Sequence, residues 1–536
     1  MRRLKVAVLD LLSKGPTSSL WSRAMQPNWA SIMPQVVGVW CEEKGHEVTF
    51  VSYTGREDLA RELPADTDIV FIASYTQTAH LAYALANIYR ERGAVTALGG
   101  SHARCYPDDA ARYFDYVLGF TDKATVEEVL RDCAPHRPQG LCLSAKRQPT
   151  QLPSVRERWK FIEPTLAKAS VIKLIPMIGS LGCPYTCSFC IDAAVDYQPL
   201  DTIQIRDDLR FLTTKVKRPM VAWHDPNFGV RFDQIMSTIE EAVPANSIDF
   251  LAESSLSLLS EPHLQRLSRN GFIAMLPGIE SWYSLGGKSK SGSRTGLEKV
   301  RQVSDHVNMI LRYIPYVQAN FVLGLDDDMG DEPFELTKRF IDLAPGAWPA
   351  YSLLSAFGQA APLNLGLQRD GRVLPTPFHF LDNNKATNVR PKNYSWSSLY
   401  DNVIGLRRHS FSWPAIGRRM HANPRPLARW MNVVRAVSSE GFGRIKHDTH
   451  VRRLLDQDLS VRRFFEGESE ALPTFYTDQV RKDLGPFFWE ALPEGALRHD
   501  PNAYLKAHEA AQAQLPALAA PPRAPMGLAP QSPPAS

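Results

Sequence analysis

The chain has 536 residues, more than one hydrophobic core usually holds, so we expect two or three domains. Its 61 basic and 57 acidic residues nearly cancel, and it has no strongly basic stripe of the kind that binds DNA or RNA. No stretch approaches the roughly 18 uninterrupted apolar residues of a membrane helix, and the first residues do not resemble a secretory signal. We therefore expect a cytoplasmic protein with no nucleic-acid partner and no membrane partner.

Residues 1–135 alternate between strand-like and helix-like patterns. Strands separated by helices of about 10–15 residues are typical of α/β proteins and predict a doubly wound parallel sheet. The predicted strands are 5–10, 47–53, 68–74, 94–98 and 116–118, and the predicted helices are 31–44 and 79–92.

A second alternating region follows after residues 136–168, which are rich in proline, arginine and glutamine and are predicted to be a linker. Residues 169–375 predict a partial (βα)6 TIM-type barrel, with functional residues at the carboxyl ends of its strands. Its predicted strands are 171–179, 220–224, 247–252, 273–278, 314–323 and 348–354, and its predicted helices include 232–242, 261–270 and 332–343.

Residues 376–512 predict a mainly helical C-terminal region, and the Pro/Ala-rich residues 513–536 predict a disordered tail. The helical region contains an aromatic set that either caps the barrel mouth over a ring-bearing substrate or forms a small helical core, and we favour the core. The set comprises Trp396, Trp413, Trp430, Phe475, Tyr476, Phe487, Phe488 and Trp489.

Three of the seven cysteines, Cys183, Cys187 and Cys190, fall within eight residues directly after a predicted strand, and none follows them. Thiolates are soft ligands that suit zinc or iron–sulfur clusters. A structural zinc site needs four ligands. No fourth cysteine lies nearby in the sequence to complete a zinc site or a ferredoxin-type cluster. One loop with three thiolates favours a 4Fe–4S cluster in which one iron has no protein ligand.

The pattern Cys183-x-x-x-Cys187-x-Phe189-Cys190 resembles the signature of the radical S-adenosylmethionine superfamily. The resemblance implies that the amino and carboxylate groups of S-adenosylmethionine chelate the open iron. It also implies that one electron from the cluster cleaves this cofactor to methionine and a 5′-deoxyadenosyl radical. Phe189 would pack near the adenine, although an aromatic residue at this position also fills a core.

Further strand ends of the predicted barrel resemble cofactor-binding segments of the same superfamily. The segment 223–228 (WHDPNF) is similar to a "DDNF" motif, with Pro226 replacing the second acidic residue, and residues 278–281 (GIES) match a second motif. Carboxylates at these ends can accept charge-assisted hydrogen bonds from ribose hydroxyls or an ammonium group, although each is individually as well explained as a helix cap or an ion-pair member. The implied S-adenosylmethionine contacts are Phe189, Asp225, Glu253, Gly278 and Glu280.

The order of the two domains resembles the subgroup of this superfamily with an N-terminal cobalamin-binding domain. Residues 10–15 stand where that subgroup has a DxHxxG motif, with Leu12 in place of the histidine that ligates cobalt. Any cobalamin would therefore lack a lower imidazole from this loop, and a degenerate domain kept for packing is the alternative. The implied cobalamin contacts are Asp10, Gly15, Ser74, Thr76, Gly99 and Gly100.

The resemblance implies an enzyme that methylates an unactivated carbon or phosphorus centre of a small molecule. A cobalamin-independent radical enzyme that catalyses a rearrangement or an oxidation is the first alternative, and a non-catalytic iron–sulfur or zinc protein is the second. We also expect a reductase, a flavodoxin or a ferredoxin as electron donor. The sequence identifies neither the substrate nor a catalytic residue.

Overall fold

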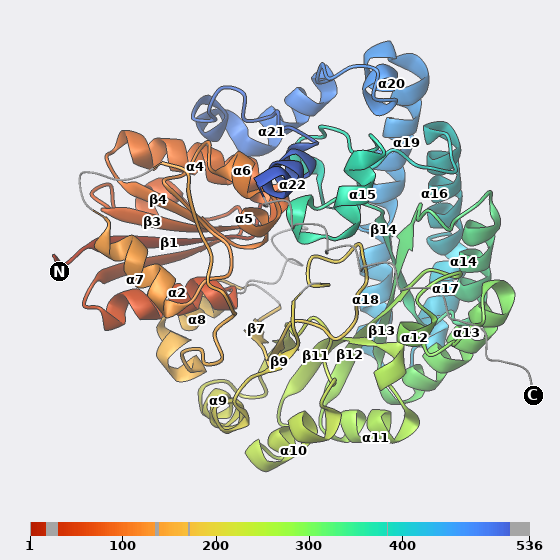
Figure 1. The fold of residues 1–536 in the computed structure, drawn as a ribbon. Coiled ribbons are helices and arrows are strands. Elements are labelled where there is room, and N and C mark those ends of the chain that lie inside the picture. Colours follow the sequence, from red (N-terminus) through yellow and green to blue (C-terminus); the bar gives the residue numbers. More distant parts are fainter. Residues whose placement is uncertain are drawn as a thin grey trace, which may run out of the picture.

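The computed structural model describes residues 2–17, 30–133, 139–169, 172–193, 195–382 and 384–514. Two parallel sheets lie side by side, and helices of the C-terminal region pack against both domains (Figure 1). The predicted α/β fold class, with a doubly wound sheet, a partial barrel and a helical C-terminal region, is confirmed.

The first sheet has six strands in the order β2-β1-β3-β4-β5-β6, all parallel. Alternate residues of β1 point to opposite faces, so Val6 and Val8 pack in one hydrophobic cluster and Ala7 and Leu9 in another. The strands are β1 (Lys5–Leu11), β2 (Glu47–Tyr53), β3 (Ile69–Ser74), β4 (Val95–Gly99), β5 (Tyr116–Leu118) and β6 (Leu141–Leu143).

Helices cover both faces of the first sheet, as its two hydrophobic faces require. Residues of α2 and α7 share the cluster that contains Val6, and residues of α4 share the cluster that contains Ala7. The helices are α2 (Ile32–Glu43), α3 (Leu59–Glu62), η1 (Thr76–Thr78), α4 (Ala79–Glu91), α5 (Ser101–Cys105), α6 (Pro107–Ala110) and α7 (Lys123–Arg131).

The segment predicted as a linker contains regular structure. Strand β6 pairs with β5, and α8 (Val155–Lys168) begins at a capping box formed by Ser154 and Glu157. Helix α8 packs against α2, where Arg158 Nη1 donates to Gln35 Oε1 at 3.1 Å. The apolar face of α8 is hidden in the sequence by charged neighbours, and β6 is only three residues long, which explains why both were missed.

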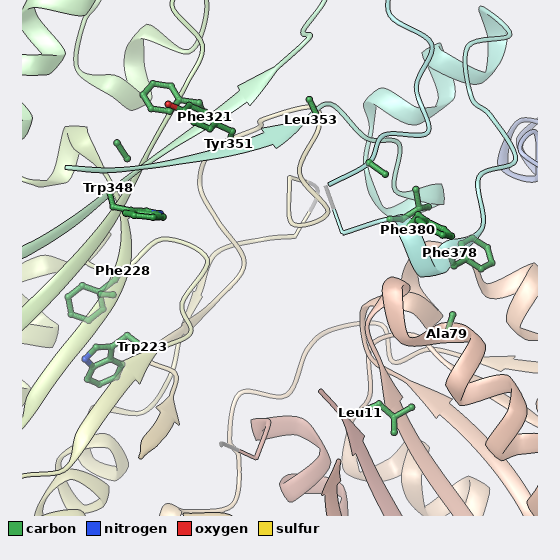
Figure 2. Close-up of a cluster of buried hydrophobic side chains, with 14 of the residues drawn as sticks. Leu11, Ala79, Trp223, Phe228, Phe321, Trp348, Tyr351, Leu353, Phe378 and Phe380 are labelled. Atoms are coloured by element: carbon green, nitrogen blue, oxygen red, sulfur yellow. The ribbon is translucent and has the colours of Figure 1, made fainter. Parts of the chain in front are cut away.

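The second sheet has six parallel strands in sequential order from β7 to β14 and forms the open wall of a partial barrel. Figure 2 shows Trp223, Phe228, Phe321, Trp348 and Tyr351 along this wall. The strands are β7 (Leu174–Met177), β10 (Met220–Trp223), β11 (Asp249–Ser255), β12 (Phe272–Glu280), β13 (Tyr316–Leu323) and β14 (Trp348–Leu353), and β8 (Ser180–Leu181) pairs separately with β9 (Gln198–Pro199).

The helices between these strands have the amphipathic spacing that places one face on the sheet. They are α9 (Thr202–Lys215), α10 (Phe232–Ala242), η2 (Leu256–Leu258), α11 (Glu261–Arg269), α12 (Gly286–Ser289), α13 (Gly296–Tyr313) and α14 (Glu332–Leu343).

The C-terminal region joins the two sheets. Phe378 packs against Tyr106 of the first domain at a ring-centroid distance of 4.5 Å, and Figure 2 shows Phe378 and Phe380 close to the segment that carries Ala79. The elements are η3 (Gly358–Ala360), α15 (Leu363–Arg369), η4 (Phe378–Phe380), α16 (Trp396–Ser410), α17 (Trp413–Ala422), α18 (Pro426–Val437), α19 (Phe442–Gln457), α20 (Leu459–Phe465), α21 (Thr474–Glu490) and α22 (Ala503–Gln514).

The aromatic set of this region divides into two groups. Trp396, Tyr476 and Phe488 are buried, as expected of a helical core, whereas Trp413 and Trp430 are among the most exposed large apolar side chains. The predicted tail begins inside α22, and its residues from 515 onward lie outside the described residues. Among the described residues, no helix is long and apolar enough to span a membrane.

Candidate functional site

A cavity of about 330 Å³ lies between the two sheets, at the carboxyl ends of strands from both. The first sheet contributes Asp10, Ser74, Gly99 and Gly100, and this is the switch point of its strand order, where open α/β sheets bind ligands. The barrel side contributes Ile178, Leu181 and His224. Four of the six predicted cobalamin contacts therefore line one cavity.

The turn after β4 exposes backbone to this cavity. Gly100 has φ +94, and a Cβ there would lie 2.7 Å from the Ser74 carbonyl oxygen, so the turn requires glycine. A Cβ on Gly99 would meet no protein atom within 4 Å, because the space beside it is open. A flat ligand can thus approach this turn closely.

Asp10 is the acidic group at the end of β1. It is 1% exposed, and its Oδ2 accepts a hydrogen bond from the Ser31 backbone N–H at 2.6 Å, which ties β1 to the start of α2. Burial raises the pKa of this carboxyl to about 6. The carboxyl therefore changes charge close to neutral pH at the edge of the cavity.

Gly15 and Thr76 do not line the cavity. A Cβ on Gly15 would lie 2.1 Å from the backbone oxygen of Asp483, so this glycine lets the loop after β1 pack against α21. Thr76 is buried in η1. Both residues lie at the contact with the C-terminal region. The sequence did not indicate this contact, because DxHxxG-like spacing does not reveal what the loop packs against.

The three cysteines lie on the loop between β8 and β9, and none forms a disulfide. Cys187 is buried and the other two are half-buried. The Asp192 backbone N–H donates to Cys190 Sγ at 3.4 Å, and burial raises the pKa of the Cys190 thiol to about 11. Among the described residues, no three His, Cys, Asp or Glu side chains are close enough to hold one metal ion.

The donor chemistry of this loop nevertheless fits a 4Fe–4S cluster, because a cubane binds each thiolate at a different iron. The fit rests on three free thiols on one short loop. The assignment of Cys183, Cys187 and Cys190 as ligands stays a prediction.

Asp225 holds the start of this loop in place. Its carboxylate accepts hydrogen bonds from the Gly179 N–H at 2.9 Å and from Ser180 Oγ at 2.6 Å, and burial raises its pKa to about 6. Both oxygens are thus engaged within the protein. This geometry makes Asp225 a positioning residue for the loop, and its predicted contact with S-adenosylmethionine stays untested.

Two other acidic strand ends face each other inside the barrel. Lys288 Nζ donates to Glu280 Oε1 at 2.7 Å, and a Cβ on Gly278 would lie 2.2 Å from that oxygen. Glu253 is solvent-accessible but enclosed by the barrel wall, and this enclosure together with the charge of Glu280 raises its pKa. Gly278 therefore makes room for an ion pair beside a second carboxylate.

Phe189 packs against a small apolar cluster that includes Leu354 and Leu367, so its position is that of a core residue as well as a neighbour of the cysteines. Sequence reasoning missed two residues that line the cavity, and the first of them, Arg104, also connects the domains. Arg104, which lines the cavity, donates to the Ile191 carbonyl at 2.9 Å and pairs with Asp192 at 3.2 Å. The second, His224, directly follows β10. The only sequence feature that could have indicated it is its position beside Asp225 in the segment 223–228.

No protein-family model matches the chain. Among curated proteins, the bacteriochlorophyllide d C-12(1)-methyltransferase of Chlorobaculum tepidum is 24% identical over 394 residues, which is 71% of this chain and 82% of that protein. The bacteriochlorophyllide d C-8(2)-methyltransferase of the same organism is 28% identical over 234 residues, covering 40% of this chain and 50% of that protein.

Among solved structures, the cobalamin-dependent S-adenosylmethionine radical enzyme OxsB with aqua-cobalamin bound matches with a TM-score of 0.55 at 11% identity, over 92% of this chain and 78% of that chain. The predicted resemblance to the radical S-adenosylmethionine subgroup with a cobalamin-binding domain is confirmed. Over most of its length the chain is similar to a methyltransferase and to a cobalamin-dependent S-adenosylmethionine radical enzyme. The match to OxsB confirms the fold.

Proposed function

We propose that this enzyme methylates an unactivated carbon or phosphorus centre of a small molecule, using a 4Fe–4S cluster, S-adenosylmethionine and cobalamin. The observation that carries the proposal is the cavity that the carboxyl ends of both sheets share. In both folds, the carboxyl ends of parallel strands are where ligands bind. One space is therefore open to a ligand of the first domain and to a ligand of the barrel.

The first sheet supplies a binding surface for a corrinoid. Gly99 and Gly100 let a flat ring reach the backbone, and Ser74 and Asp10 place a hydroxyl and a carboxyl at the same edge. A corrinoid is larger than the cavity, so part of it would extend beyond the enclosed volume. When bound, cobalamin supplies a methyl group carried on cobalt.

The barrel supplies the charged contacts. The three thiolates would hold the cluster, which supplies one electron to S-adenosylmethionine when bound. Glu253 and Glu280 face the interior and can accept hydrogen bonds from ribose hydroxyls or the methionine ammonium group. Lys288 fixes the direction of the Glu280 carboxylate, and Asp225 holds the strand end that leads to the cysteines.

The electron for the cluster has to come from another protein, and a reductase, a flavodoxin or a ferredoxin is the partner we propose. The substrate is a small molecule that reaches a cavity whose lining is mostly apolar, with Ile32, Val37, Phe71 and Leu152 among its members. Both curated relatives are named as bacteriochlorophyllide methyltransferases. A bacteriochlorophyllide is therefore the first substrate to test.

The test uses the full chain, reconstituted anaerobically with iron and sulfide and supplied with hydroxocobalamin. Bound corrinoid is measured by absorption after gel filtration, and products are measured by mass spectrometry after addition of S-adenosylmethionine, a reductant and bacteriochlorophyllide d. We expect retained corrinoid and a product that has gained one methyl group.

Three outcomes would contradict parts of this proposal. Formation of 5′-deoxyadenosine without a methylated product, with corrinoid retained and across a panel of ring-bearing substrates, indicates a rearrangement or an oxidation. Radical formation in a protein that binds no corrinoid removes cobalamin from the mechanism. A colourless protein with stoichiometric zinc removes the radical chemistry altogether.

A further inference from the structure

Helices α17 and α18 carry an exposed apolar and basic surface, which we call the α17–α18 surface and define by Trp413, Leu427, Trp430, Val437, Arg425 and Arg429. The exposed fractions of its apolar members are 67% for Trp413, 70% for Leu427, 64% for Trp430 and 42% for Val437. Large apolar side chains exposed singly are ordinary, but a group on two adjacent helices marks a binding surface.

The apolar side chains of α18 follow helical spacing on the face that points away from the protein. Leu427, Trp430 and Val437 share this outer face, whereas Ala428, Asn432 and Ala436 are buried on the opposite face. The small residues of α18 thus face the protein, and its large apolar residues face outward. Among the described residues this outer face is only partly covered, since Leu427 and Trp430 keep most of their surface exposed and Val437 keeps 42% of it.

The charge of the same stretch has one sign. Residues 413–437 contain five arginines and no aspartate or glutamate. Three of the arginines are occupied within the protein: Arg418 pairs with Asp342, Arg435 pairs with Glu440, and Arg419 is buried and donates to backbone carbonyls. Arg425 and Arg429 are exposed, and neither forms an ion pair among the described residues, although Arg429 Nε donates to the Asn423 carbonyl at 2.6 Å. The partner of this surface should therefore be anionic.

The surface is held rigidly at the amino end of β14. Arg419 Nε donates to the Ala347 carbonyl at 3.0 Å, Asn423 Nδ2 donates to the Gly346 carbonyl at 3.0 Å, and the Arg435 guanidinium lies 4.5 Å from the Trp348 ring centroid. The cavity lies at the carboxyl ends of the strands, so the two sites are at opposite ends of the barrel wall. A variant of one can leave the other intact.

From these observations we propose that the α17–α18 surface docks the enzyme on an anionic lipid membrane, with α17 and α18 lying on the bilayer interface. Tryptophan side chains are favoured at the boundary between lipid headgroups and acyl chains, and exposed arginines are attracted to anionic headgroups. A helix with an apolar face and basic residues beside it lies on a membrane without crossing it. This proposal departs from the expectation of no membrane partner, which rested on the lack of a spanning helix, because a peripheral contact does not need one.

Two other occupants fit the surface less well. A second copy of the chain would bring a second surface of the same positive charge against this one, and like charges repel. An acidic protein would satisfy the arginines but gives no particular reason for two exposed tryptophans. An anionic lipid surface matches both the charge and the rings.

The test is cosedimentation of the full-length protein with two kinds of vesicle, pure phosphatidylcholine and an equal mixture of phosphatidylcholine with phosphatidylglycerol. We expect binding to the anionic vesicles only, and release when the salt concentration is raised, because screening weakens the attraction. Trp430→Ser and Trp413→Ser should each reduce the bound fraction severalfold. Each of Arg425→Gln and Arg429→Gln should weaken binding by about fivefold.

Matched controls are available on other faces. Phe487 is 56% exposed on α21, so Phe487→Ser removes an exposed aromatic side chain outside the surface. Arg369 is exposed at the end of α15, so Arg369→Gln removes a positive charge elsewhere. Both controls should bind vesicles as the parent does, and thermal unfolding should be the same for all variants because the substituted side chains are exposed.

Each remaining outcome overturns the proposal. The surface is not a membrane site if the protein does not sediment with the anionic vesicles, or if the four variants sediment as well as the parent. A dimer seen by analytical ultracentrifugation that dissociates on Trp430→Ser, without vesicle binding, assigns the surface to a second copy. Binding of soluble polyglutamate at this surface, without vesicle binding, assigns it to an acidic polypeptide.

Discussion

The two sheets of this protein both end at the shared cavity, yet they bring different chemistry to it. The first sheet presents glycines, a serine and one buried carboxyl, Asp10. The barrel lines the cavity with Ile178, Leu181 and His224. It carries its three thiols and the charged group of Glu253, Glu280 and Lys288 outside that lining. Both sheets are parallel and six-stranded, so the strands themselves do not make this difference.

The side chains at the strand ends of each sheet determine which kind of ligand that sheet can hold. Small side chains and exposed backbone suit a large flat ligand, which gains affinity from contact area. Thiolates and carboxylates suit a metal cluster and a small charged ligand, which gain affinity from individual polar contacts. Variants of each sheet test this division.

Replacement of one barrel thiol should have the largest effect. Cys187→Ala removes a predicted cluster ligand that is already buried, so we expect loss of nearly all bound iron and of all radical chemistry. Iron and sulfide analysis after reconstitution measures the first, and 5′-deoxyadenosine formation measures the second. Cys142→Ala, at an exposed cysteine of β6, is the control and should keep the iron. Full iron content in Cys187→Ala would falsify the ligand assignment.

The buried carboxyls of the two sheets should show the same pH dependence. Burial raises the pKa of both Asp10 and Asp225 to about 6. Between the unfolded and folded pKa values the folded protein binds the proton more tightly, so the stability contributed by each group falls as pH rises from about 4 to 6 and stays low above it. The shift of about 2 units corresponds to about 3 kcal/mol for each group.

Asp225→Asn and Asp10→Asn should therefore each lose this pH dependence. The measurement is urea unfolding of the parent and each variant at several pH values, and the quantity of interest is the difference between the two free energies of unfolding. We expect that difference to change between pH 4 and 7. Asp305→Asn, at an exposed position of α13, is the control and should give a constant difference. A difference that stays constant with pH for Asp225→Asn would contradict the raised pKa of the Asp225 carboxyl.

An added side chain in the glycine turn should act on ligand binding alone. In Gly99→Val the new side chain meets open space, so we expect unchanged thermal stability and at least about tenfold weaker corrinoid retention. Retention is measured by absorption after gel filtration. Gly366→Val on α15, where a Cβ also meets open space, is the control. Equal corrinoid retention in both variants would exclude this turn from the binding surface.

The smallest effect is expected at the bridge between the sheets. Arg104→Gln loses the ion pair with Asp192 and the contact with the Phe120 ring at 4.7 Å. The pair is partly exposed, so the loss should be about 1 kcal/mol. Faster amide hydrogen exchange in residues 183–193 than in the parent is the specific readout, and Arg131→Gln, which removes an exposed pair with Asp132, should not change it.

Much of this arrangement could be predicted from the sequence, because strand and helix periodicity is a local property. The predicted bounds of β2, β5, α10 and α14 agree with the structure. Helix α8 was missed although Ser154 and Glu157 carry a capping-box pattern, since its charged residues obscured the apolar face.

The site was predictable where it follows strand ends, and not where distant segments meet. Asp10, Ser74, Gly99 and Gly100 lie on the cavity because each lies at or beside the carboxyl end of a strand of one sheet. The pairing of Lys288 with Glu280 and the reach of Arg104 to Asp192 depend on how loops fold back in three dimensions. The packing of Gly15 against Asp483 could not be predicted for the same reason, since Asp483 is far along the chain.

The contact between Gly15 and Asp483 has a consequence for the synthesis of the protein. The loop after the first strand packs against α21, and Lys14 in the same loop pairs with Asp382 at 3.3 Å. Domains generally fold in order as they leave the ribosome. The first domain of this chain can form its sheet early, but this loop reaches its final packing only after almost the whole polypeptide has been made.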